Sequence, residues 1–450
     1  MSLRIIFPAV LLLLLTVAPV FAAPVVIDHD AVWSGTVELD DIVAVNAEAT
    51  LTIRPGTKIR FARRAGEGLL FLVYGTVIAE GTAEQPILFT SAATDPRPGD
   101  WRGIYLEETR EQQSLFRHCR IEFAEAALGG VRSKMRVVSS RLRHNRTAYQ
   151  GRTGLQATFI DCEILANETG FDLEKSDVTR IENCHVADNR QNGIYCSGTS
   201  PEIRDNLIER NGGAGICCRN EASPVIEGNR IRGNGIGIQG ARQVAPTVRH
   251  NDIAANDIGI GLEKMAFPQV ERNVIRDNRI GIYCNLSSYP RLHGNNIVNN
   301  RELALDLGPN QSITVSRQGP FRERAGAATA GKILGPKTKN RPGEFALLLP
   351  EDGRIDARGN WWGEAALAEL TVKGDDADLL FIEDAYDKPE SEKKYPRDRF
   401  TYAPWATSPL PDAGLIAPVG PLAAIPPETR PLPPAEMSPS SATALFPLNR

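Results

Sequence analysis

The feature that most constrains this chain is a short pattern recurring every 22 or 23 residues. Repeats of this length mark solenoids, in which each repeat forms one coil stacked on the previous one. Four series keep the step: Asn145, Asn167, Asn189, Asn211, Asn234, Asn256, Asn278 and Asn300; Asn206, Asn229, Asn251, Asn273 and Asn295; Pro201, Pro224, Pro246, Pro268 and Pro290; and Gly193, Gly215, Gly237, Gly259 and Gly281.

The residues between these series predict strands rather than helices. Single, mostly β-branched aliphatic residues stand between glycine and asparagine, without the leucine frame of leucine-rich repeats. Three short strands fit into each repeat, each burying one or two aliphatic side chains. The sequence therefore predicts an all-β fold, a right-handed parallel β-helix solenoid of 22-residue coils, with ten or more coils and terminal caps. At the strand spacing, ten coils make a rod roughly 50 Å long.

The asparagine series are interpreted as corners of the coils rather than as ligands. Asparagine tolerates the left-handed backbone conformation, so we expect these residues to adopt it where the chain turns. The side-chain amide of one coil can then hydrogen-bond to the asparagine of the next coil. Each asparagine series should therefore form a continuous ladder along the rod.

The flanking sequence divides the chain further. Residues 1–22 combine an early Arg4 with an apolar run, which is typical of a cleavable secretory signal, so we expect an exported protein, periplasmic or on the cell surface.

The rest of the chain is divided by where the repeat is regular. Residues 23–100 are expected to form an N-terminal cap with the first irregular coils, and residues 101–307 are expected to form the regular coils. The repeat pattern stops after Leu307, so residues 308–351 are interpreted as an inserted excursion from the rod. Residues 352–411 predict a closing coil and C-terminal cap. Residues 412–450 are rich in proline and predict a disordered or extended tail that a protein partner could contact.

The closing coil has its own signature, "IDARGNWW". It places Asn360 in the register of Asn295, and Trp362 in the register of Ile297. Trp362 is therefore expected to fill the last layer and plug the C-terminal end of the core.

Composition narrows the possible partners. A net charge of -4 over 450 residues implies neither nucleic acid nor an anionic membrane surface as partner. After the leader, no stretch reaches the eighteen or so apolar residues that a membrane span requires. We therefore expect no nucleic-acid partner and no membrane span.

Seven cysteines in an exported chain raise the question of disulfides. Cys162 and Cys184 share one row on adjacent coils, and Cys196 and Cys218 share another, at a spacing that permits bridging. Small thiols also fill such layers as plain apolar residues. The sequence leaves both pairings open.

The histidines do not suggest a metal site. A copper site would need His, Met or Cys side chains that converge. Instead the histidines fall on different coils and rows, so no metal ligand and no cofactor is predicted: His118, His144, His185, His250 and His293.

Several segments resemble a known group of proteins: "ATLTIRPGTKIRF", "GTVIAEGTAEQPILFTS", "GDWRGIYLE", "GNWWG" and "YAPWATSP". Together with the coils, they resemble exported right-handed β-helix repeat proteins, in particular the NosD-like members of the carbohydrate-binding and sugar-hydrolase β-helix group. The resemblance covers about residues 44–409. It implies the fold, but the group includes lyases, hydrolases, epimerases and copper-site maturation factors, so it implies no single activity.

Two outward rows of the Gly-Ile strand are the candidate binding surface. They bring together aromatic, acidic and small residues, as suits a glycan, with a dip at Gly261 that could seat a sugar ring. The candidate ligand-binding residues are Asp172, Glu174, Tyr195, Arg219, Glu263 and Tyr283. Ordinary exposed strand residues are the competing interpretation. A different outward row alternates in charge and is interpreted as holding the coils in register: Glu182, Arg204, Glu227, Arg249, Glu271 and His293.

The sequence thus predicts a non-catalytic scaffold that binds an extended ligand, a polysaccharide or a cell-envelope component. No catalytic residue is assigned, because the known lyase, polygalacturonase and epimerase signatures are missing. One alternative is a polysaccharide lyase or hydrolase whose acid and base come from Asp172, Glu174, Glu263 and Arg219. Another is a NosD-like maturation factor for an envelope copper protein.

Overall fold

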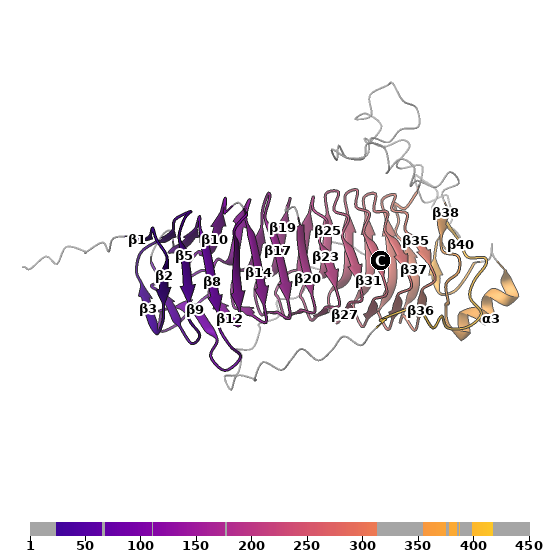
Figure 1. Cartoon of the computed structure of the whole chain (residues 1–450). Coiled ribbons are helices and arrows are strands. Elements are labelled where there is room, and N and C mark those ends of the chain that lie inside the picture. Colours follow the sequence, from indigo (N-terminus) through magenta and orange to yellow (C-terminus); the bar gives the residue numbers. More distant parts are fainter. Residues whose placement is uncertain are drawn as a thin grey trace, which may run out of the picture.

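The computed structural model describes residues 24–64, 68–109, 111–175, 178–312, 354–374, 378–384, 387 and 398–416. The predicted signal peptide, residues 313–351 of the predicted excursion and residues 417–450 of the proline-rich tail lie outside these ranges. The described chain is a rod whose N-terminal coils lie at one end and whose only described helix, α3 (Glu364–Lys373), lies at the other (Figure 1).

Three parallel sheets run the length of the rod, and each coil contributes one strand to each sheet. In sheet A the strands are β1 Val25–Ile27, β4 Val43–Val45, β7 Leu70–Val73, β10 Gly103–Glu107, β13 Ala126–Val131, β16 Thr147–Gly151, β19 Thr169–Glu174, β22 Ile194–Ser197, β25 Ala214–Arg219, β28 Ile236–Ala241, β31 Ile258–Glu263, β34 Ile280–Asn285, β37 Leu303–Leu307 and β39 Ile382–Glu383. In sheet B they are β2 Ala31–Trp33, β5 Thr50–Ile53, β8 Thr76–Glu80, β11 Gln113–Arg117, β14 Lys134–Val138, β17 Gln156–Ile160, β20 Val178–Glu182, β23 Glu202–Arg204, β26 Val225–Glu227, β29 Thr247–Arg249, β32 Gln269–Glu271 and β35 Arg291–His293. In sheet C they are β3 Thr36–Leu39, β6 Lys58–Phe61, β9 Ile87–Ser91, β12 Cys119–Glu122, β15 Arg141–Arg143, β18 Glu163–Leu165, β21 His185–Ala187, β24 Leu207–Glu209, β27 Arg230–Arg232, β30 Asp252–Ala254, β33 Val274–Arg276 and β36 Asn296–Val298.

This arrangement is a parallel β-solenoid of about 13 coils, which confirms the predicted fold class. At the strand spacing its length is about 60 Å. The coils begin at β1, so residues 25–91 already form three complete coils at the N-terminal end of the rod.

Both asparagine series form the predicted ladders inside the corners. The side-chain Nδ2 of Asn251, for example, donates to Oδ1 of Asn273 at 2.9 Å, and Oδ1 of Asn251 accepts from Nδ2 of Asn229 at 3.0 Å. The same Oδ1 also accepts from the backbone N of Asn229. Apart from the half-buried Asn300, the ladder amides are buried and hydrogen-bonded, so the ladders hold successive coils in register.

The prediction that the ladder asparagines adopt the left-handed conformation is wrong. The left-handed residue is the one that precedes the ladder position, such as Asp205 (φ 54°), His250 (φ 54°) or Asp277 (φ 57°). The asparagine itself must point its amide into the corner toward the next coil. The preceding residue, whose side chain faces outward, therefore makes the turn.

Most of the large buried rings lie in the N-terminal half of the core, and aliphatic side chains predominate in the later regular coils. Trp101 lies buried against Phe61, with parallel rings 3.9 Å apart, and its Nε1 donates to the carbonyl of Glu122 at 2.8 Å. The segment before β10 is thereby fastened to the coil of β12.

The C-terminal end is closed by residues that return after the undescribed segment. Asn295 donates to Asn360 at 2.9 Å, so Asn360 continues the ladder as its register predicts. Trp362 is 5% exposed and contacts the rings of Phe381 and Tyr402. β38 (Arg354–Asp356) pairs with β40 (Arg399–Thr401) above this layer.

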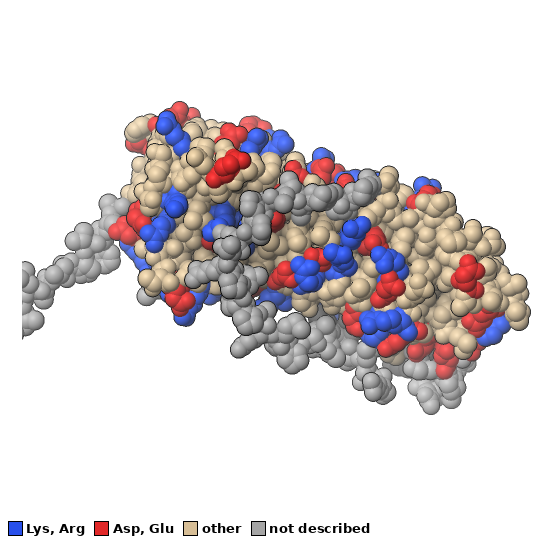
Figure 2. Space-filling view, turned by 90° about the horizontal axis from the view of Figure 1, so that it is seen from below, with Lys and Arg blue, Asp and Glu red and all other residues tan. Residues whose placement is uncertain are grey.

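Charged residues on the outside mostly occur as opposite-sign neighbours. The predicted row of alternating charge is in register, and Arg249 pairs with Glu227 at 2.8 Å and again at 3.1 Å. Figure 2 shows the same mixture of basic and acidic side chains on one face of the rod. A region where like charges stack is therefore unusual in this molecule.

Candidate functional site: a cationic rim on sheet A

The turns that lead from sheet A to sheet B have an unusual backbone on four successive coils. Two consecutive non-glycine residues adopt positive φ on each coil: Asn220 and Glu221, Arg242 and Gln243, Lys264 and Met265, and Leu286 and Ser287. Such residues cost about 1–2 kcal/mol each, so the surrounding contacts must impose them. Backbone hydrogen bonds between coils do so, for example from Gln243 N to the carbonyl of Lys264 at 3.1 Å.

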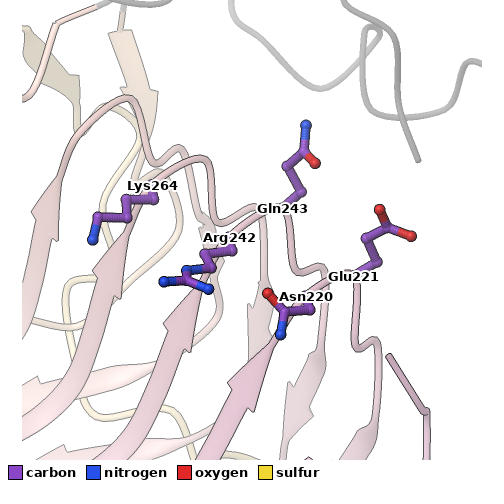
Figure 3. Close-up of a pocket in the computed structure, with 5 residues that line it drawn as sticks. All are labelled: Asn220, Glu221, Arg242, Gln243 and Lys264. Carbon is purple, nitrogen blue, oxygen red and sulfur yellow. The ribbon is translucent and has the colours of Figure 1, made fainter. Parts of the chain in front are cut away.

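These turns line a hollow of about 390 Å³, bounded by Asn220, Glu221, Arg242, Gln243 and Lys264. We call these five residues the rim. The side chains of Asn220, Arg242 and Lys264 extend to the same side, whereas Glu221 and Gln243 point the other way (Figure 3). Because the three occupy one position on neighbouring coils, they form a row at about the 4.8 Å strand spacing.

The rim stacks two cations without a counterion. No ion pair joins Arg242 or Lys264 to a carboxylate in the described part of the chain, and the same holds for Arg219 in the neighbouring row. Elsewhere, stacked arginines such as Arg249 and Arg279 meet carboxylates on adjacent coils. Like charges on adjacent strands repel, so the rim carries a positive charge that an anion would relieve.

A carboxyl group with a perturbed pKa lies beside the rim. Burial raises the pKa of Glu263, and the nearby charges of Lys264 and Arg219 only partly oppose that effect. Arg219 is half-buried, and its Nε has no hydrogen-bond partner in the described region. The arrangement thus combines unpaired donors with an acid that retains its proton to higher pH than an ordinary glutamate.

Sheet pairing places all six predicted ligand-binding residues on the outer face of sheet A, but it does not gather them at one site. Asp172 and Glu174 both lie against Arg152, whose Nη2 is 2.7 Å from Asp172 and whose Nη1 is 3.9 Å from Glu174. Glu263 is four coils away from Glu174 along the sheet, roughly 19 Å. Arg219 and Glu263 are two coils apart and lie beside the rim.

The two predicted tyrosines differ in exposure. Tyr195 is half-buried, whereas Tyr283 is 6% exposed, and burial with the nearby charges of Asp306 and Glu263 raises the pKa of Tyr283. Gln239, which flanks the expected dip at Gly261, is 3% exposed. The dip is therefore not an open seat for a sugar ring, because the side chains on both sides of it are buried.

Sequence reasoning missed Asn220, Arg242 and Lys264. Their signal was present, because they repeat at steps of 22 immediately after the row that contains Arg219 and Glu263. A column with two cations and no acid differs from the alternating charges of the other rows. The hollow itself depends on the double left-handed turns, for which no glycine pattern gives a cue.

All seven cysteines are buried free thiols. Cys184 lies in the asparagine ladder, where its backbone N donates to Oδ1 of Asn206 at 2.8 Å.

Among the described residues there is no group of three His, Cys, Asp or Glu side chains that could hold a metal ion. In that same part of the chain, no helix has the length and apolar character needed to cross a membrane.

Comparisons with known proteins agree with the architecture. A family model described as a right-handed β-helix region matches residues 148–301, and one described as a pectate-lyase like β-helix domain matches residues 26–158. None of the curated proteins matches the sequence significantly.

Solved structures with a similar fold include the periplasmic alginate epimerase AlgG. Its sequence identity is 12% and its TM-score is 0.42, and the match covers 62% of this chain and 76% of that chain. The A-module of the Azotobacter vinelandii mannuronan C-5 epimerase AlgE6 has 13% identity and a TM-score of 0.40, over 70% of this chain and 78% of that chain. Pectate lyase Pel9A has 14% identity and a TM-score of 0.32, over 56% and 72%. At these values the likenesses carry no argument about activity. The two family models match neighbouring parts of the chain and agree with the observed coils that this chain folds as a right-handed parallel β-helix.

Proposed function

We propose that this protein is an exported, non-catalytic β-helix scaffold that binds an extended, anionic polysaccharide or envelope polymer along the outer face of sheet A. The carrying observation is the rim, where Arg242 and Lys264 stack without a counterion beside Arg219. Leader-like residues 1–22 support export.

The geometry of the rod suits a polymer rather than a small ligand. The rim is open to solvent and repeats along the rod axis, so successive coils offer donors to successive groups of a chain lying parallel to it. Guanidinium and ammonium groups form charge-assisted hydrogen bonds with carboxylates or sulfates. One matching family model is described as pectate-lyase like, and pectate is a polyanion.

Retention on immobilised polysaccharides tests the proposal. The double variant Arg242→Gln/Lys264→Gln is compared with Arg136→Gln/Lys58→Gln, which removes the same charges from exposed positions on sheets B and C. Each lost charge-assisted bond removes about 1.5 kcal/mol. We expect the rim variant to bind a polyuronate at least tenfold more weakly, and the control variant to bind it like the unmodified protein.

Ionic strength and ligand charge provide further checks. Binding should weaken as salt rises, because the rim is exposed and its charges are screened. A neutral polysaccharide of similar length should not be retained. Equal retention of the two double variants would remove the rim as the binding site.

A second candidate is a polysaccharide lyase or hydrolase, and the raised pKa of Glu263 favours it. A protonatable carboxyl group beside unpaired cations is an arrangement that enzymes use for acid and base catalysis. Asp172 and Glu174 suit that role less, because Arg152 pairs with both. Incubation with acidic polysaccharides, followed by assays for unsaturated and reducing ends, distinguishes the candidates: cleavage that is lost in Glu263→Gln would establish the enzyme.

A further inference from the structure

The rim is part of a longer row of turn residues at one corner of the rod. Strand pairing aligns one residue from each of five successive coils, and all five have positive φ: Lys175 (52°), Gly198 (62°), Asn220 (51°), Arg242 (67°) and Lys264 (55°). We call these five residues the turn row. Because side-chain direction follows backbone conformation, the members of the row point alike, as Asn220, Arg242 and Lys264 do in Figure 3.

Lys175 adds a third unpaired cation to the turn row. Its side chain is exposed and forms no ion pair with a carboxylate in the described part of the chain. The acid that precedes it, Glu174, lies 3.9 Å from Nη1 of Arg152, which balances part of that charge. Lys175 is three coils from Arg242, about 14 Å, so the turn row has cations toward both ends and a gap between them.

The gap contains a notch at Gly198. A Cβ added at this glycine would meet only ordinary contacts, the carbonyl oxygen of Asn220 at 3.6 Å and Cγ of Lys175 at 3.7 Å. Space for a side chain is therefore present and unfilled. Nδ2 of Asn220 donates to Oγ of Ser197 at 2.8 Å, which fixes this amide as one wall of the notch. Uncharged polar groups thus border a hollow that lies between cations.

On the basis of the proposed function, we infer that the turn row is the binding site for an acidic polysaccharide, with one sugar ring of the polymer seated in the notch over Gly198. Acidic groups on one side of that ring bind Lys175, and acidic groups on the other side bind Arg242 and Lys264. The hydroxyl groups of the ring lie beside the amide of Asn220. The acidic groups of the ligand must therefore be spread over at least about 14 Å.

An acidic sugar chain fits this arrangement better than a single anion does. One carboxylate or phosphate can contact both Arg242 and Lys264, which are about 4.8 Å apart, but it cannot reach Lys175 as well. A chain that lies parallel to the rod axis reaches all three cations, and its rings have the bulk to fill the notch. Contacts linked within one ligand raise its affinity above that of either contact alone. Affinity should therefore increase sharply once the ligand is long enough to bridge the gap.

A length series of oligouronates tests the role of Lys175, with dissociation constants measured by calorimetry. Lys175→Gln is compared with Lys58→Gln, which removes an exposed lysine from sheet C. We expect Lys175→Gln to bind oligomers longer than about 14 Å about tenfold more weakly, because one charge-assisted bond is lost, and to bind shorter oligomers like the unmodified protein. Lys58→Gln should bind every oligomer like the unmodified protein.

Filling the notch tests the seat for the sugar ring. Gly198→Asn places a side chain in the notch, and Gly233→Asn is the matched control at the corner that follows sheet C. Gly233 has φ 63° and meets nothing nearer than 3.8 Å with an added Cβ. Asparagine accepts this conformation, as Asn220 shows at φ 51°, so both variants should keep the unfolding midpoint of the unmodified protein. We expect Gly198→Asn to bind the long oligomers about tenfold more weakly, and Gly233→Asn to bind them normally.

The rim double variant Arg242→Gln/Lys264→Gln separates this inference from the proposed function. If that variant loses binding while Lys175→Gln and Gly198→Asn both bind long oligomers normally, the proposed function stands and the extended site is refuted. If the rim double variant itself binds normally, the proposed function fails, and the extended site fails with it. A loss in Lys175→Gln that is equal for short and long oligomers also refutes the bridging of the gap.

Discussion

Asn295 and Asn360 are 65 residues apart in the sequence, yet Nδ2 of Asn295 donates to Oδ1 of Asn360 at 2.9 Å. Nδ2 of Asn360 in turn donates to the carbonyl of Leu292 at 2.7 Å. The ladder that begins inside the regular coils is therefore completed by Asn360, which belongs to the described segment 354–374. The closing coil is part of the stack, because its corner satisfies the last amide of the ladder.

The ladder should contribute strongly to stability. Asn251→Ala removes a buried amide that donates to Asn273 and to the carbonyl of Ile226, and it leaves the buried backbone N of Asn229 without its acceptor. Nδ2 of Asn229 loses one of its three acceptors and keeps the carbonyls of Ile203 and Glu227. Each buried polar group left unsatisfied costs about 1–3 kcal/mol, so we expect a loss of about 2–3 kcal/mol in urea unfolding. Gln269→Ala, on the exposed face of β32, is the control and should change stability by less than about 0.5 kcal/mol. Similar effects of the two substitutions would contradict the role of the ladder.

The plug at the C-terminal end is a second determinant of stability. Trp362→Ala opens a cavity next to Phe381 and Tyr402 and should cost about 3–5 kcal/mol, measured by the shift in the unfolding midpoint. Trp362→Phe should cost less, since Trp362 Nε1 is buried and finds no partner among the described residues. A loss in the phenylalanine variant as large as in the alanine variant would contradict this account.

Glu263 and Glu209 should give opposite pH dependences. Burial raises the pKa of Glu263 above its ordinary 4.5, so the folded protein binds this proton more tightly than the unfolded chain does. Stability from this group is present below pH 4.5 and is lost as pH rises toward the folded pKa. Glu263→Gln should therefore raise the melting temperature near pH 7 and have little effect below pH 4.5.

For Glu209, burial is outweighed by hydrogen bonds from Arg232 and Arg210, which lower its pKa below 4.5. Its contribution is present above pH 4.5 and is lost as pH falls through the folded pKa. Glu209→Gln should lower the melting temperature at pH 7 and converge with the unmodified protein in acid. Melting curves of both variants from pH 3 to pH 8 test the pair, and the same sign at neutral pH would refute one of the two assignments.

The thiols should be free and protected. Burial raises the pKa of Cys217 to about 11, and the other six thiols are also buried. Native protein should give almost no reaction with a thiol reagent, and denatured, unreduced protein should give seven thiols per chain. Five thiols would show that one pair is bridged, either Cys162 with Cys184 or Cys196 with Cys218. Three thiols would show that both pairs are bridged.

The 22-residue step by itself determined the coil, the three strands and the register of the ladders. A regular repeat can pair only with its own neighbours, so like residues must stack wherever the chain is a solenoid. For the same reason the sequence placed Asn360 and Trp362 in the closing layer and the six candidate residues on one face.

Only the tertiary structure decided which of those residues are accessible and which charges are paired. Arg152 pairs with Asp172 and Glu174, and Tyr283 is buried in a cluster with apolar side chains of neighbouring coils, because burial and ion pairing depend on side-chain contacts that the repeat period does not specify. The rim likewise depends on backbone turns that non-glycine residues adopt only when neighbouring coils impose them. A repeating pattern specifies which residues are neighbours, whereas the side-chain contacts of the folded rod decide which residues are exposed and which charges remain unpaired.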